Sequence, residues 1–449
     1  MQRAGRHILI FVIGLFLLGG GFFVPSGAAY ALTDQEKAQL QAEYDQLQQE
    51  IAQWQKVLDE TRAKKNTLQG DVKTLDAQIS KATAEIKQRN VTISTLGDEI
   101  NKKTANIATL EQRIESGHES LAKLLRQKNE AQTRSLVMLA LSSKDLSSFF
   151  SDVDNIDSID AALQDQFAEL RATKDQTEKE REQLDAKKDQ ELDARHDVEV
   201  KKQQISNNQA EKKQLLAVTA TQEKSYQEVL AERQKRADQI RTALFELRDA
   251  EGIPFATALE YATYAQQKTG VRAAFILGIL RQESNLGVNV GQCYLTDPTT
   301  GAGRGKNTGK AFKNVMKPDR DVPPFLDLMN RLGKDPYATP VSCPLSVGYG
   351  GAMGPSQFIA STWKGYESKL AAALGVSTPN PWMAQDAIMA TALYLQGLGA
   401  SKQTYSAERE AAARYYAGAN WQKSGLSYAS SVLSYADQYQ ENIDFLNGL

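Results

Sequence analysis

The chain has 449 residues, a formal net charge of −2 and 41% hydrophobic residues. This length exceeds the roughly 100 to 200 residues of one ordinary domain, so at least two domains are expected. The near-neutral charge argues against the strongly basic class of nucleic-acid-binding proteins. Only three histidines and two cysteines are present, and they have no metal-ligand spacing, so neither a metal nor a cofactor is expected.

Residues 1–31 are predicted to be an export signal. Basic residues precede an apolar run from 8 to 18, and Ala29 and Ala31 have the small-x-small spacing of a signal peptidase site. An uncleaved membrane anchor is the alternative, because apolar residues continue to Val24. In either case the sequence predicts that most of the protein works in the periplasmic or extracellular cell-wall space.

Residues 33–250 have the heptad pattern of a coiled coil. Apolar residues recur at alternating steps of four and three from Leu40 to Lys128, and more weakly from Leu163 to Leu247. A strict 3.5-residue period is typical of helices that supercoil around each other. Two arms around an irregular apolar segment predict an antiparallel hairpin with its tip near 141–158. An uninterrupted first arm of about 90 residues would be roughly 135 Å long.

The centre of this hairpin is Leu141-Ser-Ser-Lys-Asp-Leu-Ser-Ser-Phe-Phe150. Hairpin and centre together resemble the N-terminal coiled coils of bacterial cell-wall hydrolases and hydrolase activators of the PcsB and EnvC type. Coiled coils of those families dock on the membrane complex FtsEX, so the resemblance implies an FtsEX-type partner at the tip. A plain spacer, a dimerisation stalk or a small local core at the tip are the alternatives.

After Gly252 the heptads end, and short segments with helical apolar spacing are joined by loops rich in Gly and Pro. The region 252–449 is therefore predicted to be one mainly helical domain. Cys293 and Cys343 both lie in it, and an even number of cysteines in an exported chain favours a disulfide. Two free buried thiols are the alternative.

Glu283 is the candidate acid of this domain. It lies near the end of Val271–Gly287, an apolar run that predicts a helix ending at the glycine. The negative end of the helix dipole and the apolar neighbours both favour the protonated carboxyl group. A general acid that cleaves a glycosidic bond needs this property at neutral pH. Without further context, a glutamate at a helix end is more commonly a solvated charge.

Further motifs follow in the order Glu283-Ser284, Gly351-Ala-Met-Gly-Pro-Ser-Gln-Phe358 and Arg414-Tyr-Tyr416. This order resembles the lytic transglycosylases of bacterial peptidoglycan, and the MltB type most of all. The resemblance implies a lysozyme-like fold with Glu283 as the single acid and base. It also implies that the substrate site includes Ser284, Gly351, Ala352, Met353, Gln357, Phe358, Tyr415 and Tyr416.

Particular roles follow from the same resemblance. Ser284 would orient the acid, Gln357 would pair with sugar hydroxyls, and Tyr415 would approach the acid. Met353 and Phe358 also fit simple packing in the cleft wall. The chain departs from the family at Tyr416, where the family has asparagine.

The family's reaction cleaves the β-1,4 bond between N-acetylmuramic acid and N-acetylglucosamine and leaves a 1,6-anhydro product. The sequence also permits hydrolysis by a muramidase with Asp297, Asp319 or Asp321 as second carboxylate. A third hypothesis is a non-catalytic activator or scaffold of cell-wall hydrolases. We further expect regulation through the coiled coil, which could fold back over the cleft until a membrane partner binds.

Overall fold

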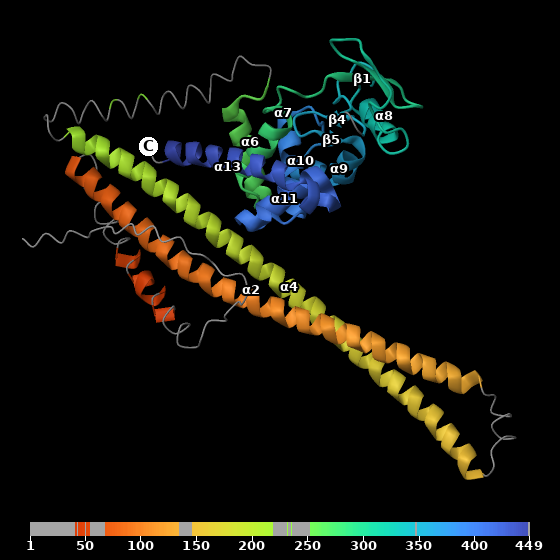
Figure 1. The fold of residues 1–449 in the computed structure, drawn as a ribbon. Helices are drawn as coiled ribbons and strands as arrows, with labels where there is room; N and C mark the ends of the chain where they lie inside the picture. Colours follow the sequence, from red (N-terminus) through yellow and green to blue (C-terminus); the bar gives the residue numbers. More distant parts are fainter. Residues whose placement is uncertain are drawn as a thin grey trace, which may run out of the picture.

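The computed structural model describes residues 41–42, 44–49, 51–53, 68–133, 146–218, 231, 235, 252–345 and 348–447. These residues form a long helical hairpin and a mostly helical globular domain (Figure 1). The predicted export signal lies outside the described residues, as do residues 141–145 of the predicted tip. Within the described ranges, no helix has the length and apolar character needed to cross a bilayer.

The hairpin consists of α2 (Leu68–Thr133) and α4 (Leu146–Val218). Ion pairs between the two helices run from Asp76–Lys212 near one end to Lys128–Asp160 near the other. One residue number rises as the other falls, so the helices are antiparallel. Their shared interface buries apolar residues of the predicted heptads, among them Leu75, Leu96, Leu110, Leu163 and Leu184. The predicted antiparallel coiled-coil hairpin is confirmed, and residues 146–158 of the predicted tip are helical.

The start of the predicted first arm is not in line with α2. The helical residues between 41 and 53 pack against α2, where Leu47 shares a buried cluster with Ala84 and Val91. In a continuous helix, Leu47 and Ala84 would be about 55 Å apart at 1.5 Å per residue. The helical residues between 41 and 53 therefore lie beside α2 and not in line with it, and this packing buries Leu47.

The globular domain is built mainly from helices, as predicted. The longer ones are α6 (Phe255–Thr269), α7 (Ala273–Ser284), α8 (Val322–Arg331), α9 (Ala360–Leu374), α10 (Ala384–Gly397), α11 (Tyr405–Ala417) and α13 (Leu426–Asn447). Short turns η2 (Ala400–Lys402), η3 (Gly418–Asn420) and α12 (Trp421–Ser424) complete the helical part.

Helix α7 is the centre of the core. Every residue from Ala273 to Leu280 is buried, because this apolar run is surrounded by α6, α10 and α13. A Cβ atom at Gly278 would lie 2.7 Å from the carbonyl oxygen of Val432 on α13. Glycine at this position therefore allows the two helices to cross closely. Glu283 lies in the last turn of this central helix, at the edge of the core.

Two small antiparallel sheets lie beside the helices. The first contains β1 (Cys293–Asp297), β2 (Ala302–Gly305) and β3 (Ala311–Phe312), in that order. The second pairs β4 (Ala352–Met353) with β5 (Phe358–Ile359) around the turn at Gly354. A disulfide between Cys293 and Cys343 joins β1 to the segment before β4, with the two Cα atoms 5.0 Å apart. The predicted disulfide is confirmed.

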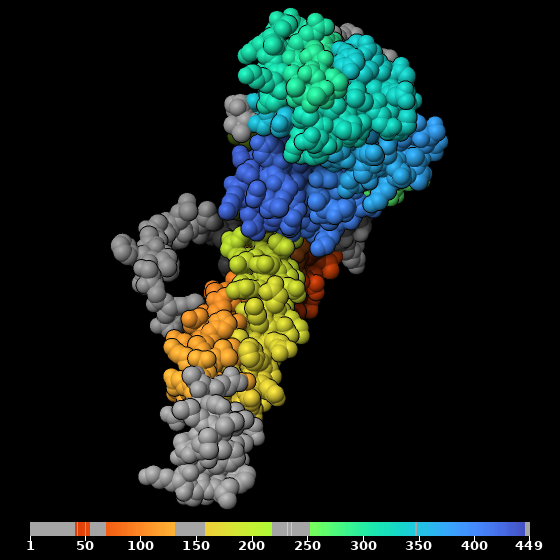
Figure 2. All heavy atoms as spheres, turned by 90° about the vertical axis from the view of Figure 1, so that its right-hand side faces the viewer, coloured from red at the N-terminus to blue at the C-terminus, as the bar shows by residue number. Residues whose placement is uncertain are grey.

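The hairpin contacts the globular domain at the first turn of α11. The Asp193 carboxylate on α4 accepts hydrogen bonds from the backbone N–H of Ser406 at 2.6 Å and from its hydroxyl at 3.0 Å. The His196 ring stacks on Tyr405 with centroids 4.0 Å apart. In Figure 2 the C-terminal helices, in blue, rest on the yellow part of the rod. Helix α4 thus helps to cap α11, which carries two of the predicted site residues at its other end.

Candidate active site

Glu283 is held at the C-terminal end of α7. The helix ends at Ser284, and Asn285 and Leu286 follow with positive φ angles of 52° and 55°. This left-handed turn ends the helix three residues before the glycine that the sequence indicated, since Asn285 adopts the conformation that usually requires glycine. The Glu283 side chain is half-buried at this turn. It therefore combines an apolar environment with access from solvent.

A tyrosine that the sequence analysis did not select completes the surroundings of this acid. The Tyr428 hydroxyl, in the first turn of α13, donates a hydrogen bond to the Glu283 carboxylate. Burial raises the pKa of Glu283 from 4.5 to about 7, and the hydrogen bond from Tyr428 opposes this rise. At neutral pH the group is thus poised between its acid and base forms.

Tyr415 and Tyr416 adjoin this pair from the end of α11. The Tyr415 hydroxyl donates to the carbonyl oxygen of Ser356 at 2.7 Å. Burial and the nearby Glu283 charge raise the pKa of Tyr415 well above its usual value, so its hydroxyl stays protonated. The Tyr416 ring stacks on Tyr428 with centroids 5.0 Å apart, and 59% of Tyr416 is exposed. The exposed Tyr416 ring therefore stacks on Tyr428, the residue that donates a hydrogen bond to Glu283.

The segment from Gly351 to Phe358 forms a tight β-hairpin. Gly351 has a φ of 90°, and a side chain there would press on Met316 and the carbonyl oxygen of Val315. Gln357 also has a positive φ, 53°, and its side-chain N–H donates to the Gly354 carbonyl oxygen at 2.8 Å. This contact uses one amide donor and leaves the other donor and the amide oxygen for further partners.

The remaining predicted residues of this hairpin differ in exposure. Met353 and Phe358 are buried, whereas Ala352 is half-exposed. The Phe358 ring packs edge-on against the rings of Tyr394 and Tyr415, at centroid distances of 5.5 and 5.7 Å. Phe358 and Met353 thus support the site from within the core.

Ser284 connects the helix to the hairpin. Its hydroxyl donates to the Pro355 carbonyl oxygen at 2.6 Å and accepts from the Gly287 N–H at 2.8 Å, and the residue is 1% exposed. The structure gives Ser284 no hydrogen bond to the Glu283 carboxylate. The hydrogen bond from Ser284 to Pro355 and the one from Tyr415 to Ser356 together bring the three sequence motifs to one place in the fold. A role of Ser284 in orienting the acid would therefore act through the backbone.

The three aspartates proposed as a second carboxylate, Asp297, Asp319 and Asp321, have surroundings that differ from those of Glu283. Asp321 is fully buried, and its oxygens accept from the Ser361 hydroxyl and the Arg320 guanidinium, both at 2.6 Å. Asp297 closes the turn between β1 and β2 through Thr300, and Asp319 is exposed before α8. Within the part of the chain that the structure describes, no carboxylate contributes to the raised pKa of Glu283.

Nothing in the sequence alone identified Tyr428. It lies on the apolar stripe of α13 that also carries Val432 and Ala436, where an aromatic residue is ordinarily a core residue. Only the crossing of α13 over α7 brings its hydroxyl to Glu283.

The region that contains Glu283 is similar to a known protein family. The family model described as "Transglycosylase SLT domain" matches residues 187–441, more than half of the chain. A solved structure of a 36 kDa muramidase/transglycosylase is similar over 46% of this chain and 80% of that chain, with 16% identical residues. Its TM-score is 0.29, which is too low to equate the two folds. Among curated proteins there is no significant match.

Proposed function

Because the chain belongs to the transglycosylase SLT domain family of peptidoglycan lytic transglycosylases, we propose that Glu283 is the single acid and base of its reaction. The supporting observation is the half-buried Glu283 carboxyl group, with a pKa of about 7 and a hydrogen bond from Tyr428. One group can serve both steps only when both of its protonation states are accessible at working pH. Glu283 meets this requirement.

The proposed reaction cleaves the β-1,4 bond between N-acetylmuramic acid and N-acetylglucosamine. Protonated Glu283 gives its proton to the glycosidic oxygen as the bond from C1 to that oxygen breaks. The acetamido group of the substrate then stabilises the positive charge at C1. Ionised Glu283 removes the proton of the muramoyl 6-hydroxyl, whose oxygen bonds to C1. The product is a 1,6-anhydro sugar, and no water is consumed.

Neighbouring side chains are assigned supporting roles in this proposal. Tyr428 is a positioning residue, since its hydroxyl fixes the Glu283 carboxylate and partly stabilises its ionised form. The exposed Tyr416 ring offers a flat apolar face of the kind on which sugars stack. It stands where the family has asparagine, so this subsite differs from the family pattern. Gln357 retains the amide oxygen and one N–H donor to pair with sugar hydroxyls.

Product analysis tests the proposal. Purified sacculi are digested with the full chain and with Glu283→Gln, and mass spectrometry identifies the released muropeptides. We expect anhydro ends from the wild type and a loss of at least a thousandfold with Glu283→Gln. Glu260→Gln is the matched control, because Glu260 is exposed on α6.

Two outcomes would contradict this assignment in different ways. Reducing ends in place of anhydro ends would identify a muramidase. If the wild type released nothing but stimulated another hydrolase, the protein would be a non-catalytic activator or scaffold.

We also propose that the protein acts in the cell-wall space and is regulated through its hairpin. The contact of Asp193 and His196 with the first turn of α11 supports the regulatory part of this proposal. Tyr405 and Tyr415 are ten residues apart on this helix, about 15 Å at 1.5 Å per residue. A movement of α4 would therefore reach the site through α11, without the hairpin lying over Glu283.

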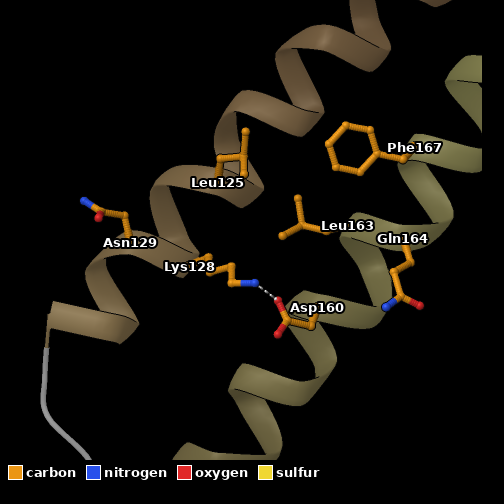
Figure 3. A pocket seen from close by; sticks show the side chains of 7 residues that line it. All are labelled: Leu125, Lys128, Asn129, Asp160, Leu163, Gln164 and Phe167. Atoms are coloured by element: carbon orange, nitrogen blue, oxygen red, sulfur yellow. Dashed lines mark ion pairs between the residues drawn. The ribbon is translucent and has the colours of Figure 1, made fainter.

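The far end of the hairpin has a surface suited to a partner. Near the end of α2, the two helices separate around a hollow that includes Leu125, Leu163 and Phe167 (Figure 3). Leu125 is 47% and Phe167 41% exposed, and the Lys128–Asp160 ion pair borders them. The FtsEX-type partner inferred from the sequence resemblance fits this end of the rod, because exposed apolar side chains at a rod end favour a docked helix.

Regulation is tested in the full chain. Asp193→Ala combined with His196→Ala removes the contacts with α11 and should change the rate of anhydro-product release severalfold. Asp175→Ala, at an exposed position of α4, is the control. An unchanged rate in the double variant would contradict coupling through α11.

A further inference from the structure

The segment between β1 and α8 has a local charge unlike that of the rest of the chain. Residues 301–318 contain no acidic residue, although the whole chain has a net charge of −2. The basic residues of this segment are Arg304, Lys306, Lys310, Lys313 and Lys317. A concentrated charge of one sign attracts partners of the opposite sign.

The sheet displays part of this charge on one face. Along β2 and the turn after it, Gly303 and Gly305 are buried, whereas Arg304 and Lys306 are exposed. The Lys306 N–H donates to the Gln292 carbonyl oxygen at 2.7 Å, so Lys306 extends the ladder of β1 and β2. Alternating side-chain direction therefore places both cations on the outer face of the sheet.

The neighbouring strands add to this face. Tyr294 on β1 lies opposite Arg304, and Ala311 on β3 lies opposite Arg304 on its other side. Lys313 is exposed directly after β3, next to the partly buried Phe312. Tyr294, Arg304, Lys306 and Lys313 are hereafter called the basic sheet face.

The cations of this face lack carboxylate partners. Among the residues that the structure describes, Arg304, Lys306 and Lys313 form no ion pair, whereas the nearby Arg320 pairs with Asp321 at 2.6 Å. Unpaired exposed cations retain their full attraction for an external anion. They are therefore available to a ligand.

Asn314, the residue after Lys313, contacts the segment that leads into Gly351. The N–H of Gly350 donates to the Asn314 carbonyl oxygen at 3.2 Å, and the Asn314 side chain donates to the Gly348 carbonyl oxygen. The residues after β3 thus lie against Gly348 and Gly350, directly before Gly351. In Figure 2 the green-to-cyan part of the domain, which includes the sheet, forms the end opposite the yellow rod. The hairpin does not cover it in this view.

We propose that the basic sheet face binds carboxylates on the peptide stems of the glycan strand whose sugars occupy the cleft. This inference rests on the proposed function, because it requires a peptidoglycan strand near Gly351. A strand with its stems carries several carboxylates per repeat, so three cations on one face can pair with them simultaneously. Individually weak contacts then add along the polymer and hold it while the cleft acts.

A binding experiment tests this inference without relying on turnover. Arg304→Ala, Lys306→Ala and Lys313→Ala are combined in the full-length Glu283→Gln protein, and binding to purified sacculi is measured by co-sedimentation. We expect about tenfold weaker binding than Glu283→Gln alone at low salt, since each exposed pair contributes modestly. The difference should vanish near 1 M salt, where the Debye length falls to about 3 Å.

The control variant makes the same change in charge elsewhere. Lys268, Lys334 and Lys364 are exposed on other parts of the domain, and their combined replacement by alanine should leave binding unchanged. An equal loss of binding in the control variant and the basic-face variant would mean that only the net charge of the protein matters, and it would overturn the inference. Equal binding by the basic-face variant and its parent would overturn it as well.

Two treated substrates identify the anion. Removing the peptide stems with an amidase should abolish the difference between the basic-face variant and its parent. Stripping phosphate-containing wall polymers with hydrofluoric acid should leave the difference intact, and its disappearance would assign the face to phosphate and refute the stem proposal. If the wild type formed no anhydro product but the basic-face variant lost binding, the proposed reaction would fail and the binding inference would stand.

Discussion

Replacing Tyr428 by phenylalanine tests the arrangement around Glu283 most directly. The substitution keeps the ring that stacks on Tyr416 and removes only the hydroxyl that donates to Glu283. A hydrogen bond to a carboxylate stabilises the ionised form, so its loss must raise the pKa of Glu283 above about 7. Hydrogen bonds to charged groups contribute about 1.5–3 kcal/mol, and one pKa unit corresponds to about 1.4 kcal/mol, so the expected rise is about one to two units.

The assay is the pH dependence of kcat/KM for release of anhydro product. Because the proposed cleavage needs protonated Glu283, activity should fall as pH rises through its pKa, with the alkaline midpoint of the wild type near 7. In Tyr428→Phe this midpoint should move upward by about one unit or more. The maximal rate should fall about tenfold, since the carboxylate loses a positioning contact.

Tyr435→Phe is the matched control, because Tyr435 is also on α13 but packs under Arg281. Its alkaline midpoint should stay with that of the wild type. A lower midpoint in Tyr428→Phe, or a variant with the rate and the midpoint of the wild type, would refute the inferred effect of this hydrogen bond on the pKa of Glu283. A lower rate with an unshifted midpoint would reduce Tyr428 to a packing residue.

Three further predictions concern stability and product type. The folded-state pKa of Glu283 is raised from 4.5 to about 7, so the free energy of unfolding should fall as pH rises between these values. Glu283→Gln should therefore stabilise the fold by up to about 3 kcal/mol at pH 8 but not at pH 4, as measured by denaturant unfolding. Replacing Cys293 and Cys343 by serine should destabilise the globular domain by about 4 kcal/mol, because their disulfide closes a loop spanning 50 positions; equal melting of both forms would contradict this. Asp321→Ala should lower the free energy of unfolding by about 2 kcal/mol or more, since Ser361 and Arg320 lose a buried acceptor. The released products should still carry anhydro ends, and a switch to reducing ends would show that Asp321 takes part in the reaction.

The sequence was sufficient for features that depend on local pattern. The heptads of α2 and α4 required a partner helix, and the break between them allowed only a hairpin or an intermolecular pairing. The apolar run of α7 predicted a buried helix, whereas Glu283 at its end was selected only through the resemblance carried by the Glu283, Gly351 and Tyr415 motifs. The two cysteines could be paired because the globular region has no others.

Features that depend on contacts between distant segments could not be predicted from the local sequence pattern. The heptad pattern continued through residues 41–53, yet Leu47 packs against Ala84, because burial on α2 competes with extension of the arm. The end of α7 was also misplaced by three residues, since Asn285 takes the left-handed conformation ahead of the expected glycine. Both differences arise where several local solutions are similar in free energy and packing selects among them.

The sequence by itself determined the rod and the mainly helical domain, because periodicity and composition specify which surfaces must be buried, and it marked Glu283 as an acid through its resemblance to a family. Only the tertiary structure decided what surrounds that acid. Tyr428 reaches Glu283 because α13 crosses α7 closely at Gly278, and Ser284 meets Pro355 across 71 positions of sequence. A pKa is set by the groups within a few ångströms, and the fold alone brings those groups together.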